Sequence, residues 1–319
     1  MTDELTQRAR AWSVGLVGYG EVGRIVAEDL RALGVRQVMA WDRKLAGPER
    51  APLLEHAAAQ GVRPAGSAAE LARACDVVIS AVTASQAVAV AQQCAPALRA
   101  GAWFVDFNSA SPGAKSQAAA AVEASGGRYV EAAVMTSIPP YRSKVPMLLG
   151  GAHAREFAPA MQALGFGGAR FGDERLGIVS ATKMCRSVMI KGLEAMVIES
   201  FSAARAYGVE DAVLASLAET FPGIDWERQG AYFFQRVIEH GRRRSEEMRE
   251  VARTVEEAGL RPWSAAGTAE RQAWVADLAD RGVFGRRGEQ GFARSADWRV
   301  EADRLLGAAD GARKTSDKD

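Results

Sequence analysis

One lysine stands in a stretch of sequence that is otherwise small or apolar. The stretch is GIVSATKMCRSVMIKG, from Gly177 to Gly192, with Lys183 near its middle. A lysine among apolar neighbours loses charge stabilisation, which lowers its pKa, and an amine of this kind can serve as a general acid or base. A helix turns about 100° per residue, which places four further polar side chains within one arc of about 80° that includes this lysine: Ser180, Ser187, Lys191 and Glu194. Two interpretations fit: a buried helix with a thin exposed edge along which Lys191 pairs with Glu194, or a helix that lines a wet cleft.

A glycine-rich loop near the N-terminus has the spacing needed to bind a dinucleotide. The apolar run WSVGLV leads directly into GYGEVG, and a helical pattern follows. In such a G-x-G-x-x-G loop, Gly18 permits the tight turn, Gly20 lets the backbone approach a pyrophosphate, and Gly23 lets the helix pack on the strand. The N-terminus of the helix then attracts the anion. The expected cofactor-binding residues of the loop are Gly18, Tyr19, Gly20, Glu21, Val22 and Gly23.

The second strand of this unit ends in an acidic residue. Asp42 lies about 20 residues beyond Gly23, where a dinucleotide-binding fold places the acid that binds the ribose. Its carboxylate would accept hydrogen bonds from a 2′-hydroxyl and repel a 2′-phosphate, which favours NAD. Arg43 and Lys44 follow directly, however, and cations at this position can neutralise the phosphate of NADP. We therefore expect NAD or NADP, with the balance toward NAD.

The two halves of the chain differ in pattern. From 12 to 175, short β-rich runs alternate with alanine-rich helical stretches, which predicts an α/β fold with a Rossmann dinucleotide-binding domain. From 176 to 306 the patterns are helical throughout, which predicts an all-α domain. Its first helix, from Gly177 to Tyr207, would be about 45 Å long, as in helices that bridge domains or subunits. The small and polar tail, 307–319, is expected to be disordered.

Composition excludes several classes of protein. A net charge of +1 over 319 residues gives no basis for binding nucleic acid or an anionic membrane. The three cysteines and three histidines are scattered, so neither a disulfide framework nor a metal site is expected. The polar start lacks the apolar core of a signal peptide, and no apolar run approaches the roughly 20 residues of a membrane span. These features favour a cytoplasmic protein that acts on a small molecule.

Three later stretches resemble a known superfamily. They are DFNSASPG from Asp106 to Gly113, YVEAAVMTSIPPYRSKVPMLLGG from Tyr129 to Gly151, and the helix start GIVSATKM. Together with the glycine loop, their order resembles the β-hydroxyacid dehydrogenases, the superfamily of 6-phosphogluconate dehydrogenase and 3-hydroxyisobutyrate dehydrogenase. The second half, with KMCRS, HGRRR and RPW, resembles the branch that carries the putative phosphogluconate dehydrogenase C-terminal domain.

This resemblance implies roles for particular residues. Lys183 matches the acid/base at the reacting hydroxyl or carbonyl, which favours the cleft interpretation of its helix. Asn108 and Ser109 match residues that hydrogen-bond the substrate, and Val82 and Thr83 match a turn that closes over the cofactor ribose. Ser187 and Lys191, on the same helix face as the lysine, complete the expected substrate contacts. The family also implies a homodimer or homotetramer formed through the helical domain.

The chain departs from the family pattern at positions that affect the substrate. Ser187 replaces an asparagine, and Ile190 replaces the glutamate that assists after decarboxylation in 6-phosphogluconate dehydrogenase, which argues against that reaction. The S-G-G that offers backbone N–H groups to a substrate carboxylate is replaced by TSIPP, and proline has no N–H. A carboxylate would then be bound by Ser137, Tyr141 or Arg142, or the substrate is bulkier and less acidic at that end.

A basic cluster on a later helix has two interpretations. His240, Arg242, Arg243 and Arg244 could form a solvated face that pairs with Glu246 and Glu247, or could close the active site from the helical domain.

Three functions remain open from sequence. The first is an NAD(P)-dependent oxidoreductase that interconverts an alcohol and a carbonyl on a small or mid-sized, carboxylated metabolite, with Lys183 as acid/base. The second is an imine reductase, against which the retained lysine counts. The third is a dinucleotide sensor without turnover, which would leave Lys183 and the DFNS stretch without a role.

Overall fold

The computed structural model describes residues 3–289, 291–293 and 295–316 and divides the chain into two compact units, Met1–Cys185 and Arg186–Asp319. The division falls ten residues later than the boundary expected from sequence, because the first two turns of the long helix α8 (Ile178–Tyr207) belong to the first unit. Helix α1 (Asp3–Ala11), which precedes the predicted start of the first domain, also belongs to this unit.

The first unit is built on an eight-stranded sheet in the order β3-β2-β1-β4-β5-β6-β7-β8. All neighbouring strands are parallel except β6 and β7, which are antiparallel. The predicted α/β class with an N-terminal Rossmann domain is confirmed. The strands are β1 (Ser13–Val17), β2 (Gln37–Trp41), β3 (Arg63–Pro64), β4 (Val77–Ser80), β5 (Trp103–Asp106), β6 (Arg128–Val134), β7 (Met147–Gly150) and β8 (Ala169–Asp173).

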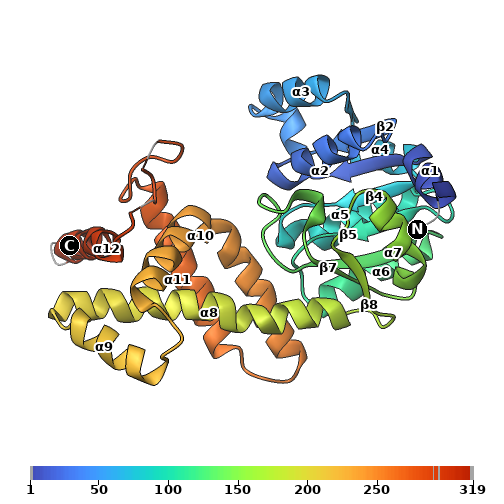
Figure 1. Ribbon diagram of the computed structural model, residues 1–319. Helices are drawn as coiled ribbons and strands as arrows, with labels where there is room; N and C mark the ends of the chain where they lie inside the picture. The colour runs from blue at the N-terminus through green and yellow to red at the C-terminus, as the bar shows by residue number, and fades with distance from the viewer. Residues whose placement is uncertain (1–2, 290, 294, 317–319) are drawn as a thin grey trace. The chain divides into compact units, whose positions relative to one another are not determined.

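Helices cover both faces of this sheet (Figure 1). Side chains alternate along a strand, so Val77 and Ile79 of β4 enter one hydrophobic cluster and Val78 enters the other. The first cluster contains residues of α1, α2, α3 and α7, and the second contains residues of α4, α5 and α6. The bounds are α2 (Glu21–Ala32), α3 (Arg50–Ala59), α4 (Ala68–Ala74), α5 (Ala87–Cys94), α6 (Pro112–Ala124) and α7 (Ala154–Ala163), with short 3₁₀ turns η1 (Arg43–Ala46), η2 (Ala84–Gln86), η3 (Ala95–Ala97) and η4 (Arg142–Lys144).

The second unit is helical, which confirms the predicted all-α domain. Helix α8 ends as expected at Gly208, whose φ of +67° is accessible to glycine. The helices that follow are α9 (Glu210–Thr220), α10 (Trp226–Glu257), α11 (Trp263–Asp280) and α12 (Trp298–Ser316). Helices α10 and α11 pack closely, since a Cβ on Gly241 of α10 would lie 2.7 Å from the Gln272 carbonyl of α11. Residues 307–316, for which the sequence predicted disorder, continue α12, and 317–319 lie outside the described residues.

The polar face of α8 within the second unit is buried, against expectation. Lys191 and Glu194 are 8% and 2% exposed, and each pairs with α10. Lys191 Nζ lies 2.5 Å from Glu247, and Glu194 accepts from Arg244, so the predicted Lys191–Glu194 pair is wrong. The sequence pattern could not show that α10 brings opposite charges to this face. Burial lowers the pKa of Lys191, and Glu247 opposes that shift.

Within the described ranges, no helix is long and apolar enough to cross a lipid bilayer. The same residues contain no grouping of histidine, cysteine, aspartate and glutamate that could hold a metal ion.

Candidate active site

The glycine loop joins β1 to α2 in a turn that leaves no room for side chains at two of its three glycines. Gly18 has a φ of +96°, and a Cβ there would lie 2.3 Å from the Ala81 carbonyl. A Cβ on Gly23 would lie 2.1 Å from the Gly18 carbonyl. A Cβ on Gly20, by contrast, would meet nothing within 4 Å, and Gly20 is the N-cap of α2. The open space above Gly20 at a helix N-terminus fits the pyrophosphate of a dinucleotide.

Asp42 lies beside this loop. Its Oδ2 accepts the Tyr19 backbone N–H at 2.7 Å, and its Oδ1 accepts the Lys44 N–H at 2.9 Å. A carboxylate has about four acceptor positions, so two remain for ribose hydroxyls. The charge of Lys44 is paired with Glu49 at 2.7 Å, whereas Arg43 is exposed and makes no hydrogen bond or ion pair with another described residue. Arg43 is therefore the cation available to a 2′-phosphate.

Tyr19 is fully buried and anchors the loop instead of lining the open space. Its hydroxyl lies 2.9 Å from His56 Nδ1, and His56 Nε2 lies 2.9 Å from Glu28. Because the Glu28 carboxylate only accepts, the His56 proton belongs on Nε2, and Nδ1 then accepts from the tyrosine hydroxyl. Burial raises the pKa of Tyr19 to about 12, so this hydroxyl stays protonated. No motif in the sequence indicated His56, which comes from α3.

A buried charge network supports the end of β5. Lys115 and Asp106 are 2% and 0% exposed, and their side chains are 3.0 Å apart. Lys115 Nζ also donates to the Asn108 carbonyl at 2.7 Å, and Tyr129 donates to Asp106 at 2.7 Å. These bonds hold the backbone of the DFNS stretch, which follows the end of β5 at Asp106 and leads to Ser109.

The Asn108 side chain is bonded within the protein, as in a residue that positions others, whereas the sequence predicted that it contacts the substrate. Its amide oxygen accepts the Val82 N–H at 2.7 Å, its amide nitrogen donates to Ser80 at 2.9 Å, and its side chain is buried. It therefore ties the loop after β5 to the loop after β4. Val82 in turn lies against the glycine loop, 3.0 Å from where a Cβ on Gly18 would be. Thr83 follows Val82 in the half-exposed turn before η2.

Lys183 and Ser109 meet at the carboxyl ends of the parallel strands. The Lys183 ammonium donates to Ser109 Oγ at 2.6 Å, and both side chains are only partly buried. A serine hydroxyl can accept from the lysine and still donate to a third group. Ligands of open parallel sheets bind at this edge, where the glycine loop also lies. A lysine and a hydroxyl in this arrangement can hold a substrate oxygen and move its proton.

Comparisons with known proteins agree with this geometry. Residues 13–170 match the NAD binding domain of 6-phosphogluconate dehydrogenase, and residues 204–275 match a domain of unknown function, DUF1932. A conserved hypothetical protein from Sinorhizobium meliloti is 36% identical, with a TM-score of 0.71 over 92% of this chain and 95% of that one.

The chain belongs to the 6-phosphogluconate dehydrogenase-like superfamily, in the branch with the DUF1932 domain. The family predicted from sequence is confirmed.

More distant solved structures share the fold. 3-Hydroxyisobutyrate dehydrogenase from Mycobacterium tuberculosis is 19% identical, with a TM-score of 0.65 over 85% of this chain and 96% of that one. An imine reductase from Myxococcus stipitatus, solved with NADP⁺, is 17% identical, with a TM-score of 0.51 over 88% of this chain and 98% of that one. At these identities the likeness concerns the fold.

Arg142, a predicted carboxylate-binding residue, is engaged elsewhere. Its guanidinium lies 2.7 Å from both Glu28 and Asp29 of α2, and the Ser143 N–H donates to Asp29 at 2.8 Å. Its φ of +52° closes a tight turn in which its own N–H bonds the Ile138 carbonyl. The guanidinium predicted to bind a substrate carboxylate thus pairs with two carboxylates of α2, which the sequence did not place beside it. Ser137 is half-buried and Tyr141 is exposed.

Removal of the Arg142 ion pairs with Glu28 and Asp29 should lower the stability of the fold by an amount that depends on pH. We expect Arg142→Ala to lower the free energy of unfolding at neutral pH by about 1 kcal/mol, since the partners are partly exposed. Hydrogen bonds from His56 and then Arg142 lower the pKa of Glu28 below its ordinary 4.5. A lowered carboxyl pKa stabilises the fold above the unfolded value and loses that effect as pH falls through the folded value. The melting-temperature difference from wild type should therefore shrink below pH 4.5, and a constant difference would contradict this account.

Two further predicted substrate residues, Ser187 and Lys191, lie in the second unit. Ser187 is 6% exposed. Lys191 is buried and paired with Glu247, so its ammonium is committed to the interior of the helical unit. The charge of Lys191 is thus paired within its own unit, and the substrate contact expected for it stays a prediction.

The basic cluster on α10 is paired with acids. Arg242 lies 2.6 Å from Asp277 and 2.7 Å from Asp280, both on α11. Arg243 pairs with Glu247 along α10, as one interpretation of the sequence expected, and Arg244 pairs with Glu194. Burial, with nearby arginines, lowers the pKa of His240 to about 4, so it is neutral at physiological pH. These pairings favour a structural role within the helical unit.

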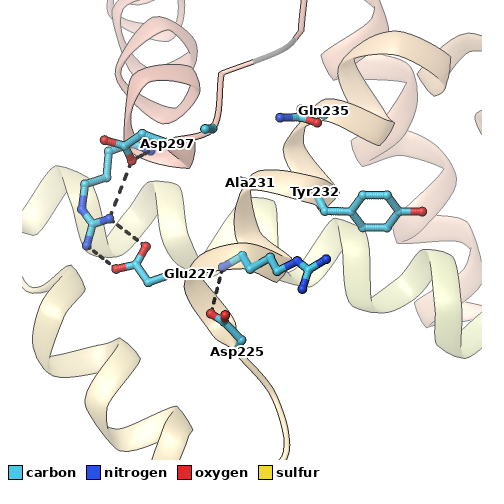
Figure 2. Close-up of a pocket in the computed structure, with 9 residues that line it drawn as sticks. Asp225, Glu227, Ala231, Tyr232, Gln235 and Asp297 are labelled. Carbon is cyan, nitrogen blue, oxygen red and sulfur yellow. Dashed lines mark hydrogen bonds and ion pairs between the residues drawn. The ribbon is translucent and has the colours of Figure 1, made fainter.

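A cleft of about 540 Å³ in the second unit contains none of the predicted site residues (Figure 2). Part of its charged lining is internally paired: Glu227 accepts from Arg299 at 2.9 Å and from Trp298 at 2.8 Å, and Asp225 caps α10. These bonds join the start of α10 to the start of α12. We assign the cleft no role in the chemistry.

Proposed function

We propose that the protein is an NAD(P)-dependent oxidoreductase that interconverts an alcohol and a carbonyl. The observation that carries this proposal is the Lys183–Ser109 pair, with 2.6 Å between Nζ and Oγ, on the sheet edge that also carries the glycine loop. Membership of the 6-phosphogluconate dehydrogenase-like superfamily supports it.

Each residue of the site has a part in this reaction. The glycine loop and Asp42 would hold the nicotinamide cofactor, which supplies the hydride acceptor or donor when bound. Lys183 would accept the hydroxyl proton during oxidation and return it to the carbonyl oxygen during reduction. Ser109 would hold that oxygen beside the amine, and Asn108 would keep the two loops in register. For the cofactor we favour NAD, because Asp42 presents a carboxylate where a 2′-phosphate would lie and Lys44 is already paired.

The substrate we propose is a small or mid-sized hydroxy acid or its keto form. Since Arg142 is engaged by α2 and Pro139 and Pro140 have no N–H, the carboxylate would be held by the hydroxyls of Ser137 and Tyr141. Recognition without a cation is weaker, so the structure also fits a bulkier and less acidic substrate.

Two alcohol panels distinguish these substrate classes. Nicotinamide absorbance would be followed with NAD⁺ and NADP⁺ against short 3-hydroxy acids and sugar acids, and against aryl or branched hydroxy acids. We expect turnover in at least one panel, with the higher kcat/KM for NAD⁺. Turnover of cyclic imines with NADPH, and of neither panel, would instead identify an imine reductase. Tight cofactor binding without any turnover would identify a sensor.

We also propose that the protein is a homodimer or homotetramer formed through the helical unit. Large apolar side chains of that unit are exposed: Met189 is 71% and Met196 60% exposed on α8, and Leu260 and Trp263 are 66% and 77% exposed before and at the start of α11. Exposed apolar surface of this kind is typical of protein interfaces. Sedimentation of the full chain measures the state directly, and a monomer at micromolar concentration would contradict this proposal.

A further inference from the structure

A buried glutamate lies beneath the start of the helix that carries Lys183. Glu131 is in the middle of β6, is 0% exposed, and is the register partner of Asp106 on β5 and of Gly150 on β7. Its Oε1 accepts the backbone N–H of Gly177 at 2.6 Å. Gly177 is the residue before α8, and its carbonyl accepts the Ala181 N–H of the first helical turn at 2.9 Å. The carboxyl group therefore holds the point at which α8 begins.

The surrounding glycines show that this contact is a close fit. A Cβ on Gly150 would lie 2.7 Å from Glu131 Oε1 and 2.7 Å from Val179 of α8. A Cβ on Gly172 of β8 would lie 2.6 Å from the same valine. The first turn of α8 thus packs directly on the backbone of β7 and β8, and Glu131 fills the space that the missing side chain leaves.

The same arrangement connects the helix start to Ser109. Gly177 has a φ of +88°, and a Cβ on it would lie 3.2 Å from Pro112, the first residue of α6 and the third residue after Ser109. Asp106 fixes the loop before Ser109, and Glu131, its neighbour across the strands, fixes the turn before Lys183. Two adjacent carboxyl groups of the sheet therefore support the two members of the pair.

We propose that Glu131 is a positioning residue that sets the distance between Lys183 and Ser109 by holding the Gly177 N–H. The expected effect on kcat rests on the proposed function. The expected position of Lys183 relative to Ser109 does not. The hydrogen-bond acceptor, and not the negative charge, performs this role. Burial raises the pKa of Glu131, and Lys115 and the bonded N–H oppose that shift, so the charge itself is a cost to the folded state.

Substitutions of equal size separate the acceptor from the charge. Glu131→Gln keeps an oxygen for the Gly177 N–H, whereas Glu131→Leu removes it. We expect kcat within about threefold of wild type for the glutamine variant and about 10²-fold lower for the leucine variant, since displacement of a catalytic group by about 1 Å has effects of that size. The KM for the cofactor should change little in either. A raised carboxyl pKa destabilises the fold as pH rises above its ordinary value of 4.5, so Glu131→Gln should melt at or above the wild-type temperature at neutral pH.

A buried carboxyl in the other unit provides the control for stability. Glu301 is 1% exposed, and burial also raises its pKa. Glu301→Leu removes the carboxylate that pairs with Arg304 at 3.2 Å, so it should lower the melting temperature while kcat stays at the wild-type value. If Glu131→Leu and Glu301→Leu lowered kcat equally at equal loss of stability, Glu131 would have only a structural role and the proposal would be overturned.

A spectroscopic measurement tests the geometry without any turnover. Lysines would be ¹³C-methylated, and the Lys183 signal assigned by its disappearance in Lys183→Met. We expect its chemical shift to be unchanged in Glu131→Gln and to move toward that of an exposed lysine in Glu131→Leu. An unchanged signal in the leucine variant would overturn the inference. If no substrate panel gives turnover but the signal moves as expected, the positioning role stands and the proposed function fails.

Discussion

Lys183→Met is expected to lower kcat by about 10²–10⁴-fold while the dissociation constant of the cofactor stays unchanged. Methionine has nearly the length of lysine but cannot accept or donate a proton at its end. The lysine donates to Ser109, whereas the glycine loop and Asp42 are expected to hold the cofactor, so loss of the amine should remove proton transfer and leave cofactor binding intact. Stopped-flow measurement of hydride transfer and titration of the cofactor give the two quantities separately.

Matched variants make the Lys183 result specific. Lys144→Met changes an exposed lysine of η4 and should keep wild-type kcat. Ser109→Ala removes the hydroxyl that the ammonium contacts and should lower kcat by about tenfold, less than loss of the amine, because the proton acceptor remains. Full turnover by Lys183→Met with normal cofactor affinity would show that this lysine is not the acid/base.

The second large effect is expected in the glycine loop, where one substitution should weaken cofactor binding and another should destabilise the fold. A Cβ on Gly20 would meet no protein atom within 4 Å, so Gly20→Ala should fold with stability within about 1 kcal/mol of wild type. The added methyl would, however, occupy the space through which the backbone approaches the pyrophosphate. We expect the cofactor dissociation constant to rise by at least about tenfold, which corresponds to about 1.4 kcal/mol.

Gly23→Ala should instead destabilise the fold itself. Its Cβ would lie 2.1 Å from the Gly18 carbonyl, so either the helix or the turn must move. We expect a loss of several kcal/mol in the free energy of unfolding, as for other strained substitutions. Gly167→Ala, whose Cβ would also meet nothing within 4 Å, serves as the control for both variants. Cofactor affinity unchanged in Gly20→Ala would contradict the assignment of the loop.

Local sequence patterns were enough to predict the features that depend on a continuous stretch of sequence. The glycine loop, Asp42, and the long helix from Gly177 to Tyr207 all follow from spacing and periodicity. The proximity of Lys183 to Ser109 was implied by the family resemblance, and the structure brings the two together. The short strands β3 and β8 carried no clear signal, since β3 has only two residues, both exposed.

What sequence could not supply were partners distant in the chain. Arg142 was predicted to bind substrate because its neighbours on α2, more than 110 positions earlier, could not be seen from a local pattern. The partner of Lys191 could not be seen for the same reason, since Glu247 lies on α10. In the sequence Glu131 is a charged residue between apolar neighbours of a strand, and only the fold shows that it bonds the residue before α8.

The most direct test of the central claim follows the hydride itself. A hydroxy acid deuterated at the carbinol carbon would be turned over with NAD⁺, or with NADP⁺ if that is preferred, and the reduced cofactor analysed by mass spectrometry. Our account predicts one deuterium on the nicotinamide ring for each molecule of carbonyl product, and a rate lower by about 10²–10⁴-fold in Lys183→Met. Cofactor that binds to the glycine loop but acquires no deuterium from any alcohol would contradict it.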